Sequence, residues 1–242
     1  MVNETVWEAL PTTPSPPPRA LMSITEAARV LSRPQPQIQL LSEAHALGQL
    51  FTFDTPDNTK GTDVVRHVTL CKRSHVEWLY QRPRRTKQEL LDAKLVPGPA
   101  VVVIRHLSPH APSPEEARYD PRTYYGYDHD FDWSTDPAKV VQQDDASSRW
   151  WPISATNREL LRKIECENTS LPMLLTVGGL IVGAREIVGL DHEMSELYEP
   201  TDDSRRKWAV RVRPAGDWFT DDLLHTWLIA GAGRPILWWE TS

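Results

Sequence analysis

The chain has 242 residues, of which 40% are apolar and 25% charged, a composition typical of a globular protein with one large domain or two small ones. No apolar run approaches the roughly 20 residues that span a bilayer, and the N-terminus has neither the basic start nor the apolar core of a signal peptide. A membrane protein is therefore not expected, and a cytoplasmic location is. The spacing of Cys71 and Cys166 predicts neither a disulfide framework nor a metal site, so buried free thiols are expected.

The formal net charge of −6 conceals a difference between two parts of the chain. Residues 1–100 hold 12 Lys and Arg against 10 Asp and Glu, whereas the rest of the chain holds 15 against 23. The most basic stretch is residues 60–94, with Lys60, Arg66, Lys72, Arg73, Arg82, Arg84, Arg85, Lys87 and Lys94. A basic stretch of this kind is typical of a surface that binds a polyanion. The alternative is a helix whose cations only keep its surface solvated.

Residues 1–20 are expected to form a tether. The stretch LPTTPSPPPRA, at 10–20, is rich in proline and has no hydrophobic period, which predicts an extended segment outside any core. A segment of this kind is also a candidate site for a protein partner.

Residues 21–82 predict a unit with the order helix, helix, hairpin, helix. Ser23 is followed three residues later by Glu26, the pattern of a capping box, and Ser74 opens a second box. The second helix is expected to end at Gly48. The expected elements are helices over residues 23–31, 37–48 and 74–82, and strands over residues 49–53 and 64–71.

After a linker over residues 83–97, residues 98–242 predict a second domain of short strands. A hairpin is expected to turn at Gly178 and Gly179. The expected strands cover residues 96–107, 149–154, 171–177, 180–190, 207–214 and 235–240, with a helix over residues 156–164. Many short strands separated by turns favour a small β-barrel, which makes the fold class α+β.

The first unit resembles the winged helix-turn-helix of excisionase and MerR-like DNA-binding families. The resemblance rests on SITEAARVLSRPQPQIQLLSEAHALGQLFTF followed by GTDVVRHVTLCKRSHVEWL. It implies a recognition helix that begins near Gln35 and faces the major groove, with the hairpin acting as a wing on the phosphates. The implied DNA-binding residues are Arg33, Gln35, Gln37, Gln39, Lys60, Arg66, Lys72 and Arg73. The sequence departs from the family at RPQPQ, and protein docking is the alternative role of such a unit.

The second domain resembles the PUA-like superfamily, which includes EVE and ASCH domains. The resemblance rests on the order of GLIVGAREIVGL, the polar stretch DHEMSELYEPTDDSRR, KWAVRVRP and GRPILWWE, with RWWPIS before them. It implies a concave aromatic pocket for a base, often a modified one, and the implied pocket residues are Trp150, Trp151, Tyr124, Tyr125 and Trp208. The acidic insertion over residues 128–148 departs from the family.

Tryptophans occur in two adjacent pairs, Trp150–Trp151 and Trp238–Trp239. Because consecutive residues of a strand point to opposite faces, one member of each pair is expected in the core and the other is expected to face outward or line a groove. An outward indole could stack on a base.

No catalytic residue, cofactor or metal site is expected. Asp128, Asp130 and Asp132 have the spacing that opens a calcium loop, but Trp133 stands where such a loop needs glycine. The sequence therefore predicts a non-enzymatic protein that binds duplex DNA, as a regulator or a sensor of modified DNA. The alternatives are a non-catalytic protein-interaction adaptor and the specificity subunit of a nuclease system.

Overall fold

The computed structural model describes residues 20–56, 65–107, 109–112, 114, 117, 122, 125–128, 137–196, 207–229 and 235–240. Helices and strands are both abundant and form two separate sheets, one of them mixed, which confirms the α+β class. Within these ranges no helix is long and apolar enough to cross a membrane.

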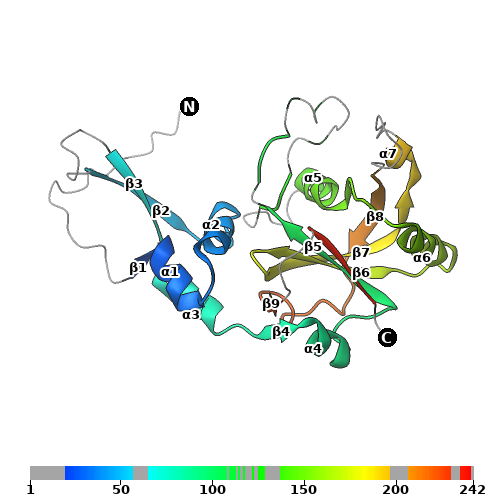
Figure 1. Ribbon diagram of the computed structural model, residues 1–242, viewed down its shortest axis with the longest axis horizontal. Helices are drawn as coiled ribbons and strands as arrows, with labels where there is room; N and C mark the ends of the chain where they lie inside the picture. Colours follow the sequence, from blue (N-terminus) through cyan, green and yellow to red (C-terminus); the bar gives the residue numbers. More distant parts are fainter. Residues whose placement is uncertain are drawn as a thin grey trace.

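Residues 20–82, called the N-terminal unit, have the predicted order of helix, helix, hairpin and helix after a short first strand. Its elements are β1 (Leu21–Ser23), α1 (Ile24–Leu31), α2 (Gln35–Glu43), β2 (Leu50–Pro56), β3 (Val65–Lys72) and α3 (Arg73–Tyr80). The strands form an antiparallel sheet in the order β1-β3-β2. The β2–β3 hairpin projects away from the larger sheet (Figure 1).

Local signals account for most of the helix boundaries in this unit. Ser23 caps α1 by accepting a hydrogen bond from the Glu26 amide at 3.1 Å, and the Glu26 carboxylate pairs with Arg73 at 2.7 Å. Two expectations were wrong. Helix α2 ends at Glu43 rather than at Gly48, and α3 begins at Arg73 without a side-chain cap, one residue before the expected Ser74 box.

The remaining described residues, which lie between 83 and 240, are called the C-terminal unit and are built on a mixed sheet of seven strands. The strand order is β10-β5-β6-β7-β9-β4, with β8 also paired to β7. The strands are β4 (Arg84–Thr86), β5 (Ala100–His106), β6 (Leu171–Val177), β7 (Leu180–Asp191), β8 (Ala209–Pro214), β9 (Trp227–Ile229) and β10 (Ile236–Glu240). The helices are α4 (Lys87–Asp92), α5 (Pro137–Ser148), α6 (Ala155–Cys166) and α7 (His192–Glu196).

The expected barrel is not found, because among the described strands β10 and β4 do not pair and the sheet stays open. The chain between β5 and β6 forms α5 and α6, and this crossover makes β5 and β6 parallel neighbours. A crossover that carries helices covers one face of a sheet. Figure 1 shows α5 and α4 on opposite sides of this sheet.

Each face of the sheet has its own core. Along β5, Val102 and Ile104 join a core shared with the N-terminal unit, whereas Val101 and Val103 join a second core that includes Leu90 of α4. This alternation follows from the two-residue period of a strand. Continuous apolar strands such as β5 and β6 are therefore explained by burial on both sides.

Residues 83–97, expected to be a linker, contain both β4 and α4. Strand β4 pairs in parallel with β9, and Leu90 is fully buried in the second core. A complete capping box starts α4: Thr86 accepts a hydrogen bond from the Glu89 amide, and the Glu89 carboxylate accepts one from the Thr86 amide at 2.6 Å.

The two units share hydrogen bonds and apolar contacts. The indole Nε1 of Trp227 donates to the Leu79 carbonyl at 2.8 Å, and the indole is almost completely buried. The Arg82 guanidinium donates to the carbonyls of Asp221 and Leu224 at 3.0 and 2.8 Å. The basic stretch therefore contributes to the junction as well as to the surface.

Candidate nucleic-acid interface

Four residues at or near the start of helix α2 were predicted to face the major groove, and two of them are exposed. Gln35 and Gln39 are exposed and lie four residues apart, so they share one face of the helix. The Gln39 amide donates to Glu43 at 3.0 Å along that face. These two amides are the exposed side-chain hydrogen-bond donors of α2, and Glu43 adds a carboxylate on the same face.

The other two predicted residues face the C-terminal unit. The Arg33 guanidinium lies 4.9 Å from the ring centroid of Trp227, a cation–π contact. Gln37 is half-buried, and its Oε1 is a buried atom without a hydrogen-bond partner among the residues that the structure describes. The backbone carbonyl of Gln37 lies so close to Gly178, in the β6–β7 turn, that a Cβ atom there would be 2.9 Å from it.

The predicted phosphate contacts are divided between surface and interior. Lys72 is exposed, whereas Arg73 is half-buried in its ion pair with Glu26. Lys60 lies outside the described residues. The backbone of Arg66 pairs with Thr55 in the hairpin, and the Arg66 side chain is outside the described part of the structure.

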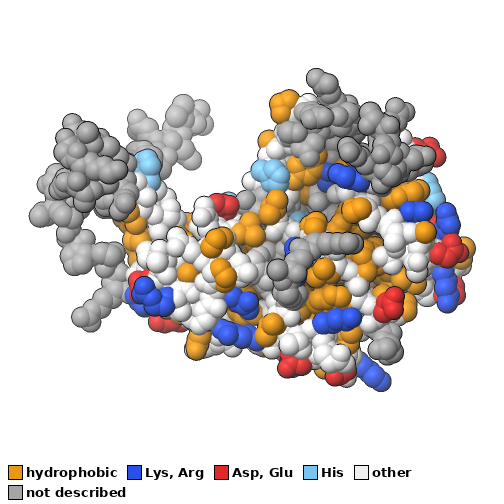
Figure 2. All heavy atoms as spheres, in the orientation of Figure 1, with side chains coloured by type: hydrophobic (Ala, Val, Ile, Leu, Met, Phe, Trp, Pro, Cys, Tyr) orange, Lys and Arg blue, Asp and Glu red, His pale blue; other side chains and the backbone are white. Residues whose placement is uncertain are grey.

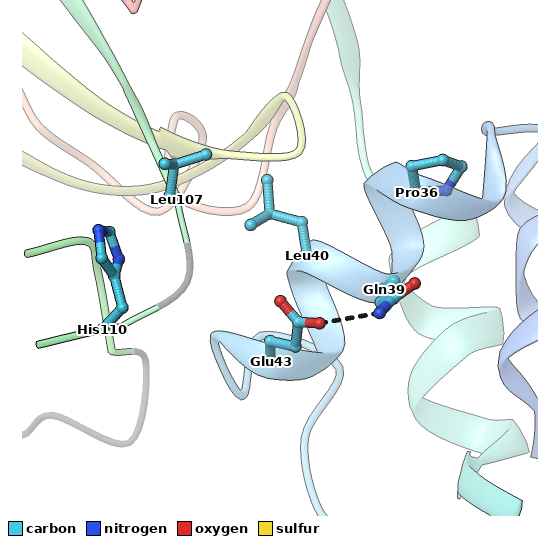
Figure 3. Close-up of a pocket in the computed structure, with 6 residues that line it drawn as sticks. All are labelled: Pro36, Gln39, Leu40, Glu43, Leu107 and His110. Atoms are coloured by element: carbon cyan, nitrogen blue, oxygen red, sulfur yellow. Dashed lines mark hydrogen bonds between the residues drawn. The ribbon is translucent and has the colours of Figure 1, made fainter.

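Between α2 and the end of β5 lies a hollow of about 450 Å³. It is lined by Pro36, Gln39, Leu40, Glu43, Leu107 and His110. Figure 3 shows Leu40 of α2 pointing toward Leu107, and Figure 2 shows the molecule hollowed between the two units on this side. Leu107 is 60% exposed, so the hollow offers apolar surface beside the carboxylate of Glu43.

The expectation that one of Trp150 and Trp151 faces outward was wrong, because the two are only 8% and 3% exposed. Residues 149–154 do not form a strand: Trp151 makes one isolated bridge with Trp208. Without a continuous ladder, the alternation of faces does not apply. The Trp151 ring instead packs edge-on against Trp238 at 6.5 Å between centroids.

The other predicted pocket residues do not combine with them into a pocket. Tyr124 lies outside the described residues. Tyr125 and Trp208 are half-buried, and each has a guanidinium over its ring: Arg122 at 4.0 Å from Tyr125 and Arg158 at 4.8 Å from Trp208. A stacking base would have to displace these cations or use the opposite ring face.

The two cysteines differ in exposure. Cys71 is buried, and burial raises the pKa of its thiol to about 11, whereas Cys166 is exposed, contrary to expectation. The described residues contain no cluster of three potential metal ligands.

No model of a known protein family matches the chain, and no curated protein or solved structure matches it either.

Arg82 and Arg84 belong to the basic stretch noted in the sequence but not to the implied DNA-binding residues, and both lie at the junction of the units. Arg84 is exposed and donates to the Leu31 carbonyl at 3.3 Å, which brings β4 to the end of α1 and close to Arg33. The sequence signal that could have shown this segment to be folded was the capping box formed by Thr86 and Glu89. It shows that the residues next to Arg84 start a helix, and so are part of the fold rather than a linker.

Proposed function

We propose that the protein binds duplex DNA through its N-terminal unit, with α2 facing the bases and the β2–β3 hairpin facing the backbone. The observation that carries this proposal is the exposure of Gln35 and Gln39 on one face of α2, the second of two short helices that precede an antiparallel hairpin. Side-chain amides of this kind make bidentate hydrogen bonds to adenine in the major groove. The resemblance to winged helix-turn-helix families is part of this proposal.

The geometry also narrows the proposed set of base contacts. Arg33 and Gln37 lie against the C-terminal unit, so Gln35 and Gln39 are left as the base-reading residues of this helix. Gln39 must exchange its hydrogen bond with Glu43 for one with a base. We therefore expect a short recognition sequence, because few side chains reach the base edges.

The experiment uses the full chain, because the two units share a core. A preferred duplex is first selected from a random library, and its affinity is then compared with that of random duplexes over a salt series. Gln35→Ala and Gln39→Ala should each reduce the preference by about 1–3 kcal/mol while leaving binding to random DNA unchanged. The matched control is Gln88→Ala, because Gln88 bonds Asp92 on exposed α4 at 2.6 Å with the same spacing. An unchanged preference in both α2 variants would exclude this helix as the reader.

A more specific version of this proposal is that the C-terminal unit recognises a modified base in DNA. The half-buried rings of Tyr125 and Trp208 are the candidates for stacking on a base, since Trp150 and Trp151 are buried. Trp208→Ala should then remove any difference in affinity between modified and unmodified duplexes of one sequence. Equal affinities of the unaltered protein for both duplexes would restrict the proposal to α2.

A protein-interaction adaptor is the second candidate, and the hollow beside α2 favours it. Leu40 and Leu107 present apolar side chains there, next to the carboxylate of Glu43. An adaptor would bind peptides that carry an apolar residue and a cation, selected from a displayed library. Leu107→Ser should abolish such binding and leave the affinity for DNA unchanged. Gln35→Ala should leave the binding of these peptides intact.

A further inference from the structure

Two guanidinium groups meet at the junction of the units. Arg33 lies in the turn between α1 and α2, and Arg84 lies on β4, which Figure 1 shows between the two units. Arg33 is held over the Trp227 ring, and Arg84 lies 5.8 Å from the ring centroid of Tyr80 and bonds the Leu31 carbonyl at 3.3 Å. Their side chains are thus oriented by rings and a carbonyl, none of which carries a negative charge.

These two cations have no carboxylate to neutralise them within the described part of the chain. Neither forms an ion pair there, whereas Arg73, Arg149, Arg185, Arg211 and Arg213 each do. Burial, and then the charge of Arg84, lower the pKa of Arg33, which shows that the two charges repel. An anion between them would replace this repulsion with two attractions.

The rest of the basic segment adds to the positive charge. Arg85 is half-buried and Lys87 is exposed, and neither has an ion pair among the described residues. The acidic side chain that Arg85 influences is Glu89, whose carboxylate is already bonded by the amide and hydroxyl of Thr86. The carboxylate of Glu89 therefore caps the start of α4.

We infer that Arg33 and Arg84 together hold one phosphate group. Guanidinium groups match phosphate oxygens through paired N–H donors, and two of them can contact one phosphate from different sides. This inference rests on the proposed function, so the phosphate is one of the duplex backbone, beside the first turn of α2. Arg33 then contributes to DNA binding as predicted from the sequence, but through the backbone rather than a base.

The test replaces Arg84, because it is exposed and its loss spares the Arg33–Trp227 contact. Full-length Arg84→Gln should bind random and preferred duplexes about threefold to tenfold more weakly, and the slope of log affinity against log salt should fall by about 1. Arg84→Lys should keep most of the slope, because it keeps the charge. Lys163→Gln is the control, since Lys163 is exposed on α6 and has only a loose 3.8 Å pair with Glu167. Affinity and slope equal to those of the unaltered protein in Arg84→Gln would overturn the inference.

A second arm separates this inference from the proposed function. If the unaltered protein binds no duplex at low salt, the DNA proposal fails, and the arginine pair is tested with inorganic phosphate alone. Phosphate should then raise the melting temperature of the unaltered protein, relative to chloride at equal ionic strength, more than that of Arg84→Gln. An equal rise in the two proteins would show that the pair does not bind phosphate from any source.

Discussion

The two units differ in what they leave at the surface. The C-terminal unit buries both faces of its sheet, and its tryptophan pair at Trp238 and Trp239 is divided between the two cores. The N-terminal unit instead exposes one face of α2, and with β4 it brings to the junction two guanidinium groups that form no ion pair among the described residues. The C-terminal unit therefore buries its tryptophan pair in its cores, whereas the N-terminal unit leaves polar side chains of α2 at the surface.

The largest expected effect concerns the residue that joins the units. Trp227→Ala should lower the free energy of unfolding by about 3–5 kcal/mol, because it removes a buried indole and the partner of the Leu79 carbonyl. Chemical denaturation measures this loss. Trp227→Phe should cost less, since it retains an aromatic ring and loses the N–H donor and only part of the buried ring volume. A denaturation midpoint unchanged in the alanine variant would mean that the units are stable independently.

The second prediction concerns Trp150 and Trp151. Because both are buried, Trp150→Ala and Trp151→Ala should each cost about 3 kcal/mol of stability, and neither should affect DNA binding selectively. Melting curves and duplex titrations of the two variants provide the measurement. If one variant kept its stability and lost only a base preference, the scaffold assignment of this half would be wrong.

The third prediction concerns Glu186, which holds the segment after β8. Its carboxylate accepts hydrogen bonds from Trp218, Gly216 and Ser170 at 2.8–3.0 Å, and it pairs with Arg213. Burial raises its pKa, but the hydrogen bonds from Trp218, Arg213, Ser170 and Gly216 outweigh burial and lower it. Glu186→Gln should cost about 2 kcal/mol at neutral pH.

The pH dependence of that loss has a defined sign. A carboxyl whose pKa is lower in the folded protein stabilises it above the unfolded pKa, and this contribution disappears as the pH falls through the folded pKa. The stability difference between the unaltered protein and Glu186→Gln should therefore be constant near neutrality and shrink below about pH 4. A difference independent of pH down to strongly acidic solution would show that the carboxylate charge is not involved.

The last prediction concerns the contact between α2 and the β6–β7 turn. Gly178 has a φ of 56°, and a Cβ atom there would lie 2.9 Å from the Gln37 carbonyl, so Gly178→Ala should cost about 1–3 kcal/mol. Gly98→Ala is the control: it also has a positive φ, of 87°, but its nearest contact would be 3.6 Å. Equal losses in the two variants would attribute the effect to the backbone conformation alone.

Sequence reasoning was most successful where the determining contacts are local. The order of elements in the N-terminal unit followed from turn residues and caps, and the hairpin at Gly178 and Gly179 was confirmed with both residues at positive φ. Helix α5 was missed, because PAKVVQQDDASS is polar and has little amphipathic pattern to separate it from an acidic loop. The open sheet was also missed, since closure of a barrel depends on how the edge strands are placed and not on the strands themselves.

Capping, proline and periodicity act over a few residues, so the order of elements in the N-terminal unit and a helix beginning near Gln35 could be predicted from the sequence. Tertiary structure alone decided which side chains remain available. It placed Arg33 and Gln37 against the other unit, buried both Trp150 and Trp151, and brought Arg84 to Arg33. The physical reason is that burial and charge proximity depend on contacts between residues far apart in the chain, and no local pattern encodes those contacts.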